Sequence, residues 1–175
     1  LLGLRAPLSF VVTSSGDGAK PVSLFAAAYL SQRVSTAARG LFARVADPGT
    51  AVTAKITDYL DAIAAALGEK APAIALMVPI MPAALGEAVS HDTLTWLYRH
   101  VTLAQSLGIS VLELRLLEEL TGQDPLGAVV PPVTESSAQR AAGFSALVAF
   151  TRAAMKVDES GLPIPLLADA VLPED

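Results

Sequence analysis

The sequence contains no cysteine and only two histidines, and these shortages exclude several kinds of chemistry. Without cysteine, the chain can form no disulfide, no thiolate metal site and no thiol nucleophile. The two histidines, His91 and His100, do not have the spacing of a metal-binding pair on one helix or of a zinc finger. We therefore predict no metal site and no cofactor. We interpret His91 as a capping or solvent-exposed residue near a helix start, and His100 as a surface or rim residue.

Basic residues and long hydrophobic runs are also scarce. The 12 Lys and Arg residues are scattered and are outnumbered by 17 Asp and Glu residues, which leaves a formal net charge of −5. A nucleic-acid partner would require a basic face, so we exclude one. The longest uncharged run, residues 71–86, is shorter than the about 20 residues that cross a membrane, and it contains Pro72, Pro79 and Pro82. We therefore expect no membrane span in this segment, and residues 1–10 do not resemble a secretory signal.

Aromatic residues make up only 5% of the chain, whereas hydrophobic residues of all kinds make up 53% and the mean hydropathy is +0.53. The usual apolar fraction of a soluble domain is about 45–50%. Most of the excess is Ala and Leu, which suits close helix–helix packing and an interface with other parts of a larger protein. The length of 175 residues is that of one domain with its own core. Because the chain does not begin with Met, we expect it to be a piece of a longer protein.

The pattern of glycine, proline and apolar residues predicts an all-α fold. We expect a single α-helical domain over residues 1–175, built as an array of antiparallel helical hairpins with about six to eight helices. Residues 1–21 form an extended arm, irregular or with a short β pair, and residues 22–175 are helical. A unit of helix, glycine turn and capped helix recurs at Gly68, Gly108 and Gly161. The predicted helices span residues 23–33, 50–67, 73–85, 94–107, 110–122, 136–157 and 164–172, with a further turn at 39–45.

Three of these segments carry more specific expectations. The apolar segment 73–85 is expected to be a buried helix that its prolines kink or split into two. Gly143 is a candidate break in the helix 136–157. Residues 127–135 contain Pro131 and Pro132 and are expected to form a loop.

Residues 94–125 show the clearest pattern, two amphipathic helices joined by one tight turn. Gly108 stops the first helix, and Ser110 with Glu113 forms the S-x-x-E capping box that starts the second. The second helix continues through Leu114 and ends at Gly122, before an Asp-Pro pair. The apolar stripe of the first helix recurs every three or four positions, at Leu94, Leu97, Tyr98, Val101, Ala104 and Leu107.

Trp96 lies off this stripe, on a second face with His100, Leu103 and Leu107. Two apolar faces require two packing partners, so we interpret Trp96 as a core or inter-helix residue rather than a ligand platform. Each large buried side chain contributes about 1.5–3 kcal/mol, whereas one helix cap contributes about 1 kcal/mol. Packing therefore decides whether this hairpin forms, and the glycine and serine of the turn set its angle.

Three patterns that resemble catalytic motifs are incomplete. Residues 16–20 (GDGAK) lack the G-x-x-x-x-G-K-[ST] spacing of a phosphate loop. Ser145 lacks the closing glycine of a nucleophile elbow. Glu118 and Glu119 are helix neighbours that point about 100° apart, so we interpret them as a solvated face rather than an acid–base pair. We therefore expect no catalytic residues and no enzymatic activity.

Short motifs follow one another in a defined order: PLS at residues 7–9, SLF at 23–25, LTWLYR at 94–99, LA at 103–104, LGISV at 107–111, LTGQDP at 120–125 and SGL at 160–162. They resemble the A component of bacterial Tc insecticidal toxin complexes, which has the approximate patterns L-S-x-L-Y-R, L-A-R-x-L-x-L-S-V-x-E-L and L-T-G-x-D-P-F. The chain departs from the family at Ala28, Ser31, Thr95, Gln105 and Leu126. The central structural motif consists of Leu94, Trp96, Leu97, Tyr98, Arg99, Leu103, Leu107, Gly108, Ser110, Glu113, Leu114 and Gly122.

The resemblance implies a place in the α-helical shell of a very large chain, which forms a homopentamer around a translocation channel and helps to deliver a toxic enzyme into host cells. It implies a secreted or bacterial surface-associated protein whose partners are the remainder of its own chain and its neighbours in the oligomer. We therefore expect a non-enzymatic scaffold segment. The alternative is a stand-alone helical binding module that recognises a peptide or a host-surface ligand through a groove near Trp96 and the Pro131-Pro132 loop.

Overall fold

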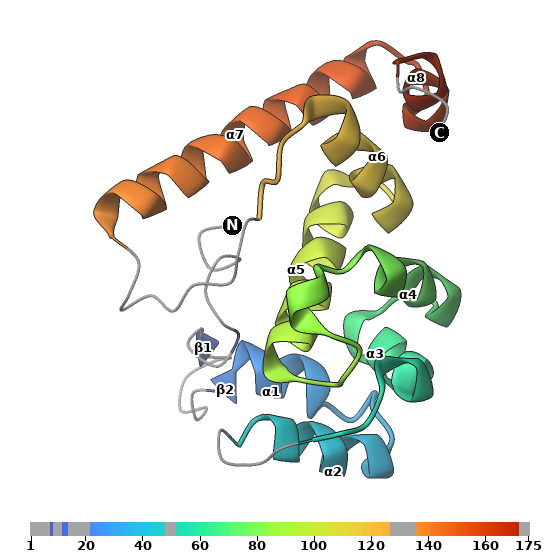
Figure 1. Ribbon diagram of the computed structural model, residues 1–175, viewed down its shortest axis with the longest axis vertical. Coiled ribbons are helices and arrows are strands. Elements are labelled where there is room, and N and C mark those ends of the chain that lie inside the picture. Colours follow the sequence, from blue (N-terminus) through green and yellow to red (C-terminus); the bar gives the residue numbers. More distant parts are fainter. Residues whose placement is uncertain (1–7, 9–11, 14–21, 48–51, 127–135, 172–175) are drawn as a thin grey trace. The chain divides into compact units, whose positions relative to one another are not determined.

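The computed structural model describes residues 8, 12–13, 22–47, 52–126 and 136–171. Within these residues the chain has eight α-helices, three short 3₁₀ helices and one two-stranded antiparallel β pair (Figure 1). The prediction of an all-α fold with six to eight helices is therefore confirmed. The chain divides into two compact units, which we call the N-terminal unit (residues 6–98) and the C-terminal unit (residues 99–175 with 1–5).

The N-terminal unit begins with the short β pair. Strand β1 (Val12–Thr13) pairs antiparallel with β2 (Val22–Ser23), so Val12 lies opposite Ser23. The arm was expected to be either irregular or part of a short β pair, and the structure shows the β pair. The side chain of Leu8 is fully buried. The GDGAK pattern at residues 16–20 lies outside the described residues.

Two capped helices follow the β pair. Helix α1 (Leu24–Tyr29) begins where the Ser23 hydroxyl accepts a hydrogen bond from the Ala26 amide, and it ends four residues earlier than expected. Helix α2 (Thr36–Val45) begins three residues before the expected turn at 39–45, because the Ser35 hydroxyl caps it by accepting from the Ala38 amide. The prediction overlooked this serine as a helix start.

The predicted helix over residues 50–67 is wrong in its first half. The Val89 amide donates to the Ala54 carbonyl at 2.7 Å, and the Ile56 amide donates to the Glu87 carbonyl at 3.0 Å. These bonds hold residues 54–56 in an extended bridge to residues 87–89, so the Ala54 carbonyl and the Ile56 amide are not available for helix bonds. The helical part is therefore limited to the 3₁₀ turn η3 (Ile56–Tyr59) and α3 (Leu60–Leu67), which Gly68 ends in the left-handed conformation with φ of +70°.

The apolar segment after α3 is split, as its prolines predicted. Helix α4 (Ala71–Met77) is followed by the 3₁₀ turns η4 (Val78–Ile80) and η5 (Ala83–Leu85). The expectation that this segment is buried is wrong in part, because Leu76 is 59% exposed while Ile74 is fully buried.

In the described part of the chain, no single helix is both long enough and apolar enough to cross a membrane. One pair of helical segments, Ile56–Leu67 with Ala71–Ile80, reaches that length and apolar character together, but the pair is bent by 117°.

Helix α5 (His91–Leu107) contributes its first half to the N-terminal unit and its second half to the C-terminal unit. It begins after Ser90, whose hydroxyl accepts a hydrogen bond from the Thr93 amide at 3.1 Å. The Tyr29 hydroxyl donates to the Leu94 carbonyl at 2.7 Å and so ties α1 to α5. The fully buried apolar core of the N-terminal unit includes Leu8, Phe25, Tyr29, Phe42, Ile56, Ile63, Ile74, Met77, Leu94 and Leu97.

The C-terminal unit contains the end of α5 and three further helices: α6 (Val111–Thr121), α7 (Ser137–Glu159) and α8 (Ile164–Val171). Helix α6 packs against both α7 and α8. Ser136 and Gln139 form a second capping box at the start of α7, and this helix continues through Gly143, so the candidate break there is wrong. Residues 127–135, the predicted loop, lie outside the described residues.

The buried hydrogen bond of Tyr29 yields a test of the N-terminal core. Tyr29→Phe keeps the ring but leaves the Leu94 carbonyl without this donor, so we expect a loss of about 1–2 kcal/mol in the free energy of unfolding. Chemical unfolding in urea measures this loss. Tyr59→Phe, at a half-exposed tyrosine of the same unit, serves as the matched control and should have little effect. Equal losses in both variants would show that the bond to Leu94 contributes nothing of its own.

Candidate functional site

A polar cluster lies inside the hairpin of α5 and α6, and it is the main concentration of unusual electrostatics in the described residues. His100 lies seven residues before the end of α5, and Glu118 lies seven residues after the start of α6. The tight turn at Gly108, with φ of +71°, therefore brings the two residues opposite each other about two helical turns away. His100 Nε2 lies 3.8 Å from Glu118 Oε1, and both side chains are largely buried.

The rim of this cluster is formed by a second pair of charges on α6. Arg115 Nη1 lies 3.4 Å from Glu118 Oε2, and Arg115 Nε lies 3.1 Å from Glu119 Oε1. The side chains of Arg115 and Glu119 are each 42% exposed, whereas that of Glu118 is only 7% exposed. His100 and Glu118 therefore form the buried part of the cluster, and Arg115 and Glu119 form its exposed rim.

Burial raises the pKa of the Glu118 carboxyl to about 7, since the charged form loses its hydration inside the hairpin. The hydrogen bond and the charge of Arg115 act in the opposite direction, and the carboxylates of Asp124 and Glu119 raise the pKa further. Glu118 therefore changes its protonation state near neutral pH. The 3.8 Å between His100 Nε2 and Glu118 Oε1 is longer than a hydrogen bond, so the two groups interact through charge rather than through a shared proton.

Two sequence-based assignments at this cluster are wrong. His100 was expected at the surface or the rim but is only 8% exposed, and Glu118 was expected on a solvated face but is buried. Only Glu119 is exposed as predicted. His100 and Glu118 are equally far in sequence from the turn, and the prediction overlooked this. Equal distances place two residues opposite each other only if both helices continue without a break up to the turn.

The residues that share the second face of α5 with His100 are packed as predicted. Trp96 and Leu103 are buried, so Trp96 belongs to the packed interior rather than to an open ligand platform. Arg99 is the largest fully buried side chain in the described part of the chain, and periodicity alone did not indicate its burial. Of the remaining motif residues, Leu94, Leu97 and Leu114 are buried, Tyr98, Leu107 and Glu113 are half-buried, and Gly108, Ser110 and Gly122 are exposed.

The turn between α5 and α6 has the geometry that the motif predicted. The Ser110 hydroxyl accepts a hydrogen bond from the Glu113 amide at 3.2 Å, and Glu113 Oε2 accepts from the Ser110 amide at 2.8 Å. Both halves of the capping box are therefore present. Gly122 ends α6 with φ of +61°, a left-handed conformation that suits glycine.

His91 has a different role from the one expected. Ser90, not His91, caps α5, and the imidazole of His91 stacks on the ring of Phe25 with centroids 5.1 Å apart. Burial lowers the pKa of His91, although the Asp92 carboxylate at 4.0 Å acts in the opposite direction. The histidine is therefore partly enclosed by aromatic packing and is not a solvent-exposed cap.

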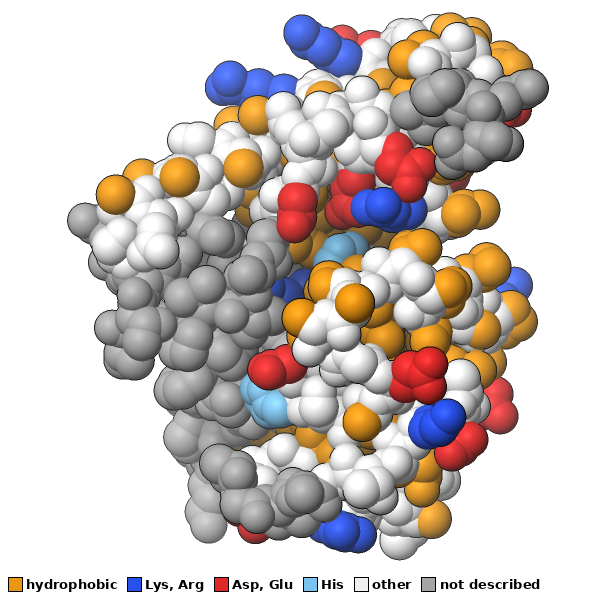
Figure 2. Space-filling view, in the orientation of Figure 1, with side chains coloured by type: hydrophobic (Ala, Val, Ile, Leu, Met, Phe, Trp, Pro, Cys, Tyr) orange, Lys and Arg blue, Asp and Glu red, His pale blue; other side chains and the backbone are white. Residues whose placement is uncertain are grey.

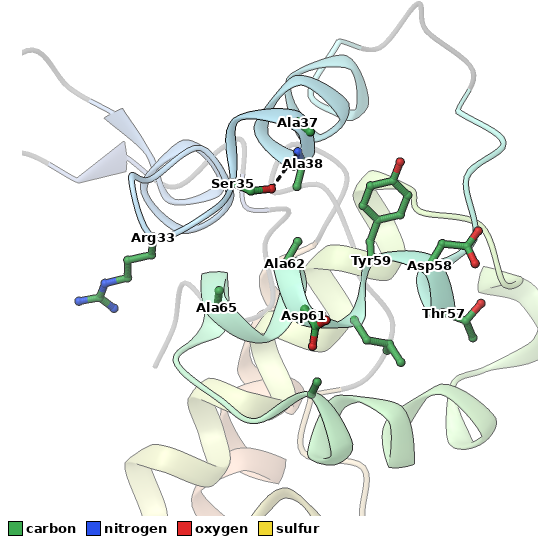
Figure 3. Close-up of a pocket in the computed structure, with 12 residues that line it drawn as sticks. Arg33, Ser35, Ala37, Ala38, Thr57, Asp58, Tyr59, Asp61, Ala62 and Ala65 are labelled. Atoms are coloured by element: carbon green, nitrogen blue, oxygen red, sulfur yellow. Dashed lines mark hydrogen bonds between the residues drawn. The ribbon is translucent and has the colours of Figure 1, made fainter.

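A hollow of about 550 Å³ in the N-terminal unit is a second candidate site (Figure 3). Alanines of α2 and α3 form much of its wall. Figure 3 shows the Arg33 side chain directed away from Asp58 and Tyr59, and the hydroxyl of Ser35 is occupied by its bond to the Ala38 amide. Arg33 therefore does not face these two residues across the hollow.

Neither of these places has the geometry of a reaction centre. No group of three His, Cys, Asp or Glu side chains that could hold a metal ion occurs among the described residues. Ser145 is an exposed residue inside α7. Comparisons with family models, with curated proteins and with solved structures found no match for this chain.

The raised pKa of Glu118 predicts a pH dependence of stability. Because the pKa in the folded state exceeds the ordinary value of 4.5, the folded state favours the protonated form. The free energy of unfolding should therefore fall, by on the order of 3 kcal/mol, as the pH rises from about 4.5 to 7, and this group should add no further slope well above pH 7. Glu118→Gln should remove this part of the slope in urea unfolding series, whereas Glu119→Gln, its exposed neighbour, should keep it. A Glu118→Gln series parallel to the parent at every pH would refute the assignment.

The burial of His100 predicts a cost for its removal. His100→Ala leaves a cavity inside the hairpin and removes the group that faces Glu118 Oε1, so we expect a loss of about 1–3 kcal/mol at pH 7. Thermal unfolding measures this loss. Ser106→Ala, at an exposed residue of α5, is the control and should change stability little. A neutral His100→Ala would restore the surface assignment that the sequence suggested.

Proposed function

We propose that this chain is a non-enzymatic helical scaffold segment of a Tc-toxin-like A component, which acts by packing against the rest of a longer chain. The observation that supports the proposal is that residues of the family-like motifs have structural roles in this chain. The motifs by which the chain resembles that family contain the residues that shape the α5–α6 hairpin: Gly108 and Gly122 as left-handed helix ends, and Ser110 with Glu113 as the capping box. Motif residues with these roles support a structural function.

Apolar surface in the C-terminal unit also supports the proposal. Figure 2 shows hydrophobic side chains among charged ones on the visible face. The C-terminal unit exposes several large hydrophobic side chains, each 47–67% exposed, and such surface favours packing against further protein. These residues are Leu112, Phe144, Met155, Leu162, Leu166 and Val171.

The wider setting follows from the resemblance alone. In this proposal the chain is part of the helical shell of a homopentamer that surrounds a translocation channel, and its partners are the remainder of its own chain and the neighbouring copies. The protein would be secreted or held at the bacterial surface and would take part in delivering a toxic enzyme to host cells. The chain itself would carry out no chemical step.

The alternative, a stand-alone binding module with a groove near Trp96, receives less support. Trp96 is only 8% exposed, which leaves little of the indole for a ligand. The second element of that groove, the Pro131-Pro132 loop, lies outside the described residues. The scaffold therefore remains the preferred function.

Dye binding and association test the scaffold proposal. The isolated chain should bind a dye for exposed apolar surface, and adding adjoining segments of a Tc-toxin A component should reduce the fluorescence as the surface becomes covered. A Phe144→Ser and Leu166→Ser double variant should bind less dye, whereas Ser145→Ala, an exposed polar position on α7, should behave as the parent. A compact monomer that binds no dye and does not associate with these segments would contradict the proposal.

A further inference from the structure

A second hollow, of about 460 Å³, lies in the C-terminal unit where four helix ends meet. One wall is formed by the end of α5, its glycine turn and the first turn of α6. The other wall is formed by the end of α7 and the turn at Gly161 that leads into α8. We call this feature the helix-end hollow. None of the residues of the His100–Glu118 cluster lines it.

The helix-end hollow has an apolar floor that remains accessible. Leu107 and Ile109 contribute from the first wall, and Met155 and Leu162 contribute from the second. Met155 is 56% exposed and Leu162 is 47% exposed, so both present apolar surface to an incoming side chain. Methionine adapts its shape to different partners, which suits a recognition surface.

The charges around this floor have one sign. Glu113 and Asp158 are the only charged residues that line the helix-end hollow, and the lining contains no lysine or arginine. Glu113 Oε2 already accepts a hydrogen bond from the Ser110 amide, but that bond leaves the carboxylate its negative charge. Asp158 is exposed on the opposite wall. Two carboxylates thus stand on either side of apolar residues.

We propose that the helix-end hollow is a docking site for a basic amphipathic helix of a partner protein. The partner inserts one or two apolar side chains between Leu107 and Met155, and its lysine or arginine residues lie against Glu113 and Asp158. A second copy of this chain fits this hollow poorly, because its net charge of −5 does not complement the two carboxylates of the lining. This inference goes beyond the scaffold proposal and does not depend on the resemblance to toxins.

The experiment uses a fluorescein-labelled model peptide with leucine on one helical face and lysine on the other. Fluorescence anisotropy with the 175-residue chain should show saturable binding that weakens as salt is added. Two versions of the peptide, one with glutamate in place of lysine and one with serine in place of leucine, should each bind at least about tenfold more weakly.

Matched variants of the chain locate the binding. Met155→Ser and Asp158→Asn should each lower the affinity for the leucine–lysine peptide by about three- to tenfold. Leu76→Ser, at a leucine that is 59% exposed in the N-terminal unit, and Asp169→Asn, at an exposed aspartate of α8, make the same chemical changes elsewhere and should leave the affinity unchanged.

Three results would overturn the proposal. The first is equal weakening by Asp158→Asn and Asp169→Asn, which would mean that the net charge alone attracts the peptide. The second is equal binding of the glutamate peptide. The third is a dimer in sedimentation velocity that Met155→Ser dissociates, which would assign the helix-end hollow to a second copy of the chain.

Discussion

The enclosure of helix α5 is the constraint on which most of the structure depends. Residues 93–97 are all buried, and five consecutive positions at about 100° per residue cover the whole circumference of a helix. A helix of this kind cannot lie at a surface with one face in water. Its first half requires α1 and the rest of the N-terminal unit around it, and its second half requires the helices of the C-terminal unit.

Enclosure also explains the electrostatics. A helical stretch that is buried around its circumference must place some polar residues away from water, and α5 does so at Thr93, Thr95, Arg99 and His100. Buried polar groups are costly unless they are paired, and the group that faces His100 is the buried carboxyl of Glu118. The raised pKa of Glu118 is therefore a consequence of how tightly the hairpin closes. It is a feature of packing, and it needs no catalytic explanation.

The features predicted correctly from the sequence are those that depend on neighbouring residues. Gly108, Ser110 and Glu113 specify the turn through local backbone geometry and a short hydrogen-bond cycle, so their roles follow from spacing alone. The wrong predictions involve distant partners. The extended bridge at residues 54–56 depends on residues 87–89, and the burial of His100 depends on a carboxylate 18 residues away. No local pattern contains either partner, so periodicity assigned a helix in one case and a surface position in the other.

Hydrogen exchange read by mass spectrometry tests the enclosure of α5 most directly. If α5 is covered around its circumference at residues 93–97, the amides of residues 94–101 should exchange more slowly than those of any other described segment, because water reaches them only when the packing around them opens. The short terminal helix α8, with most of its residues exposed, should exchange early. Exchange in α5 as rapid as in α8 would show that α5 is not enclosed and would contradict the central role assigned to it.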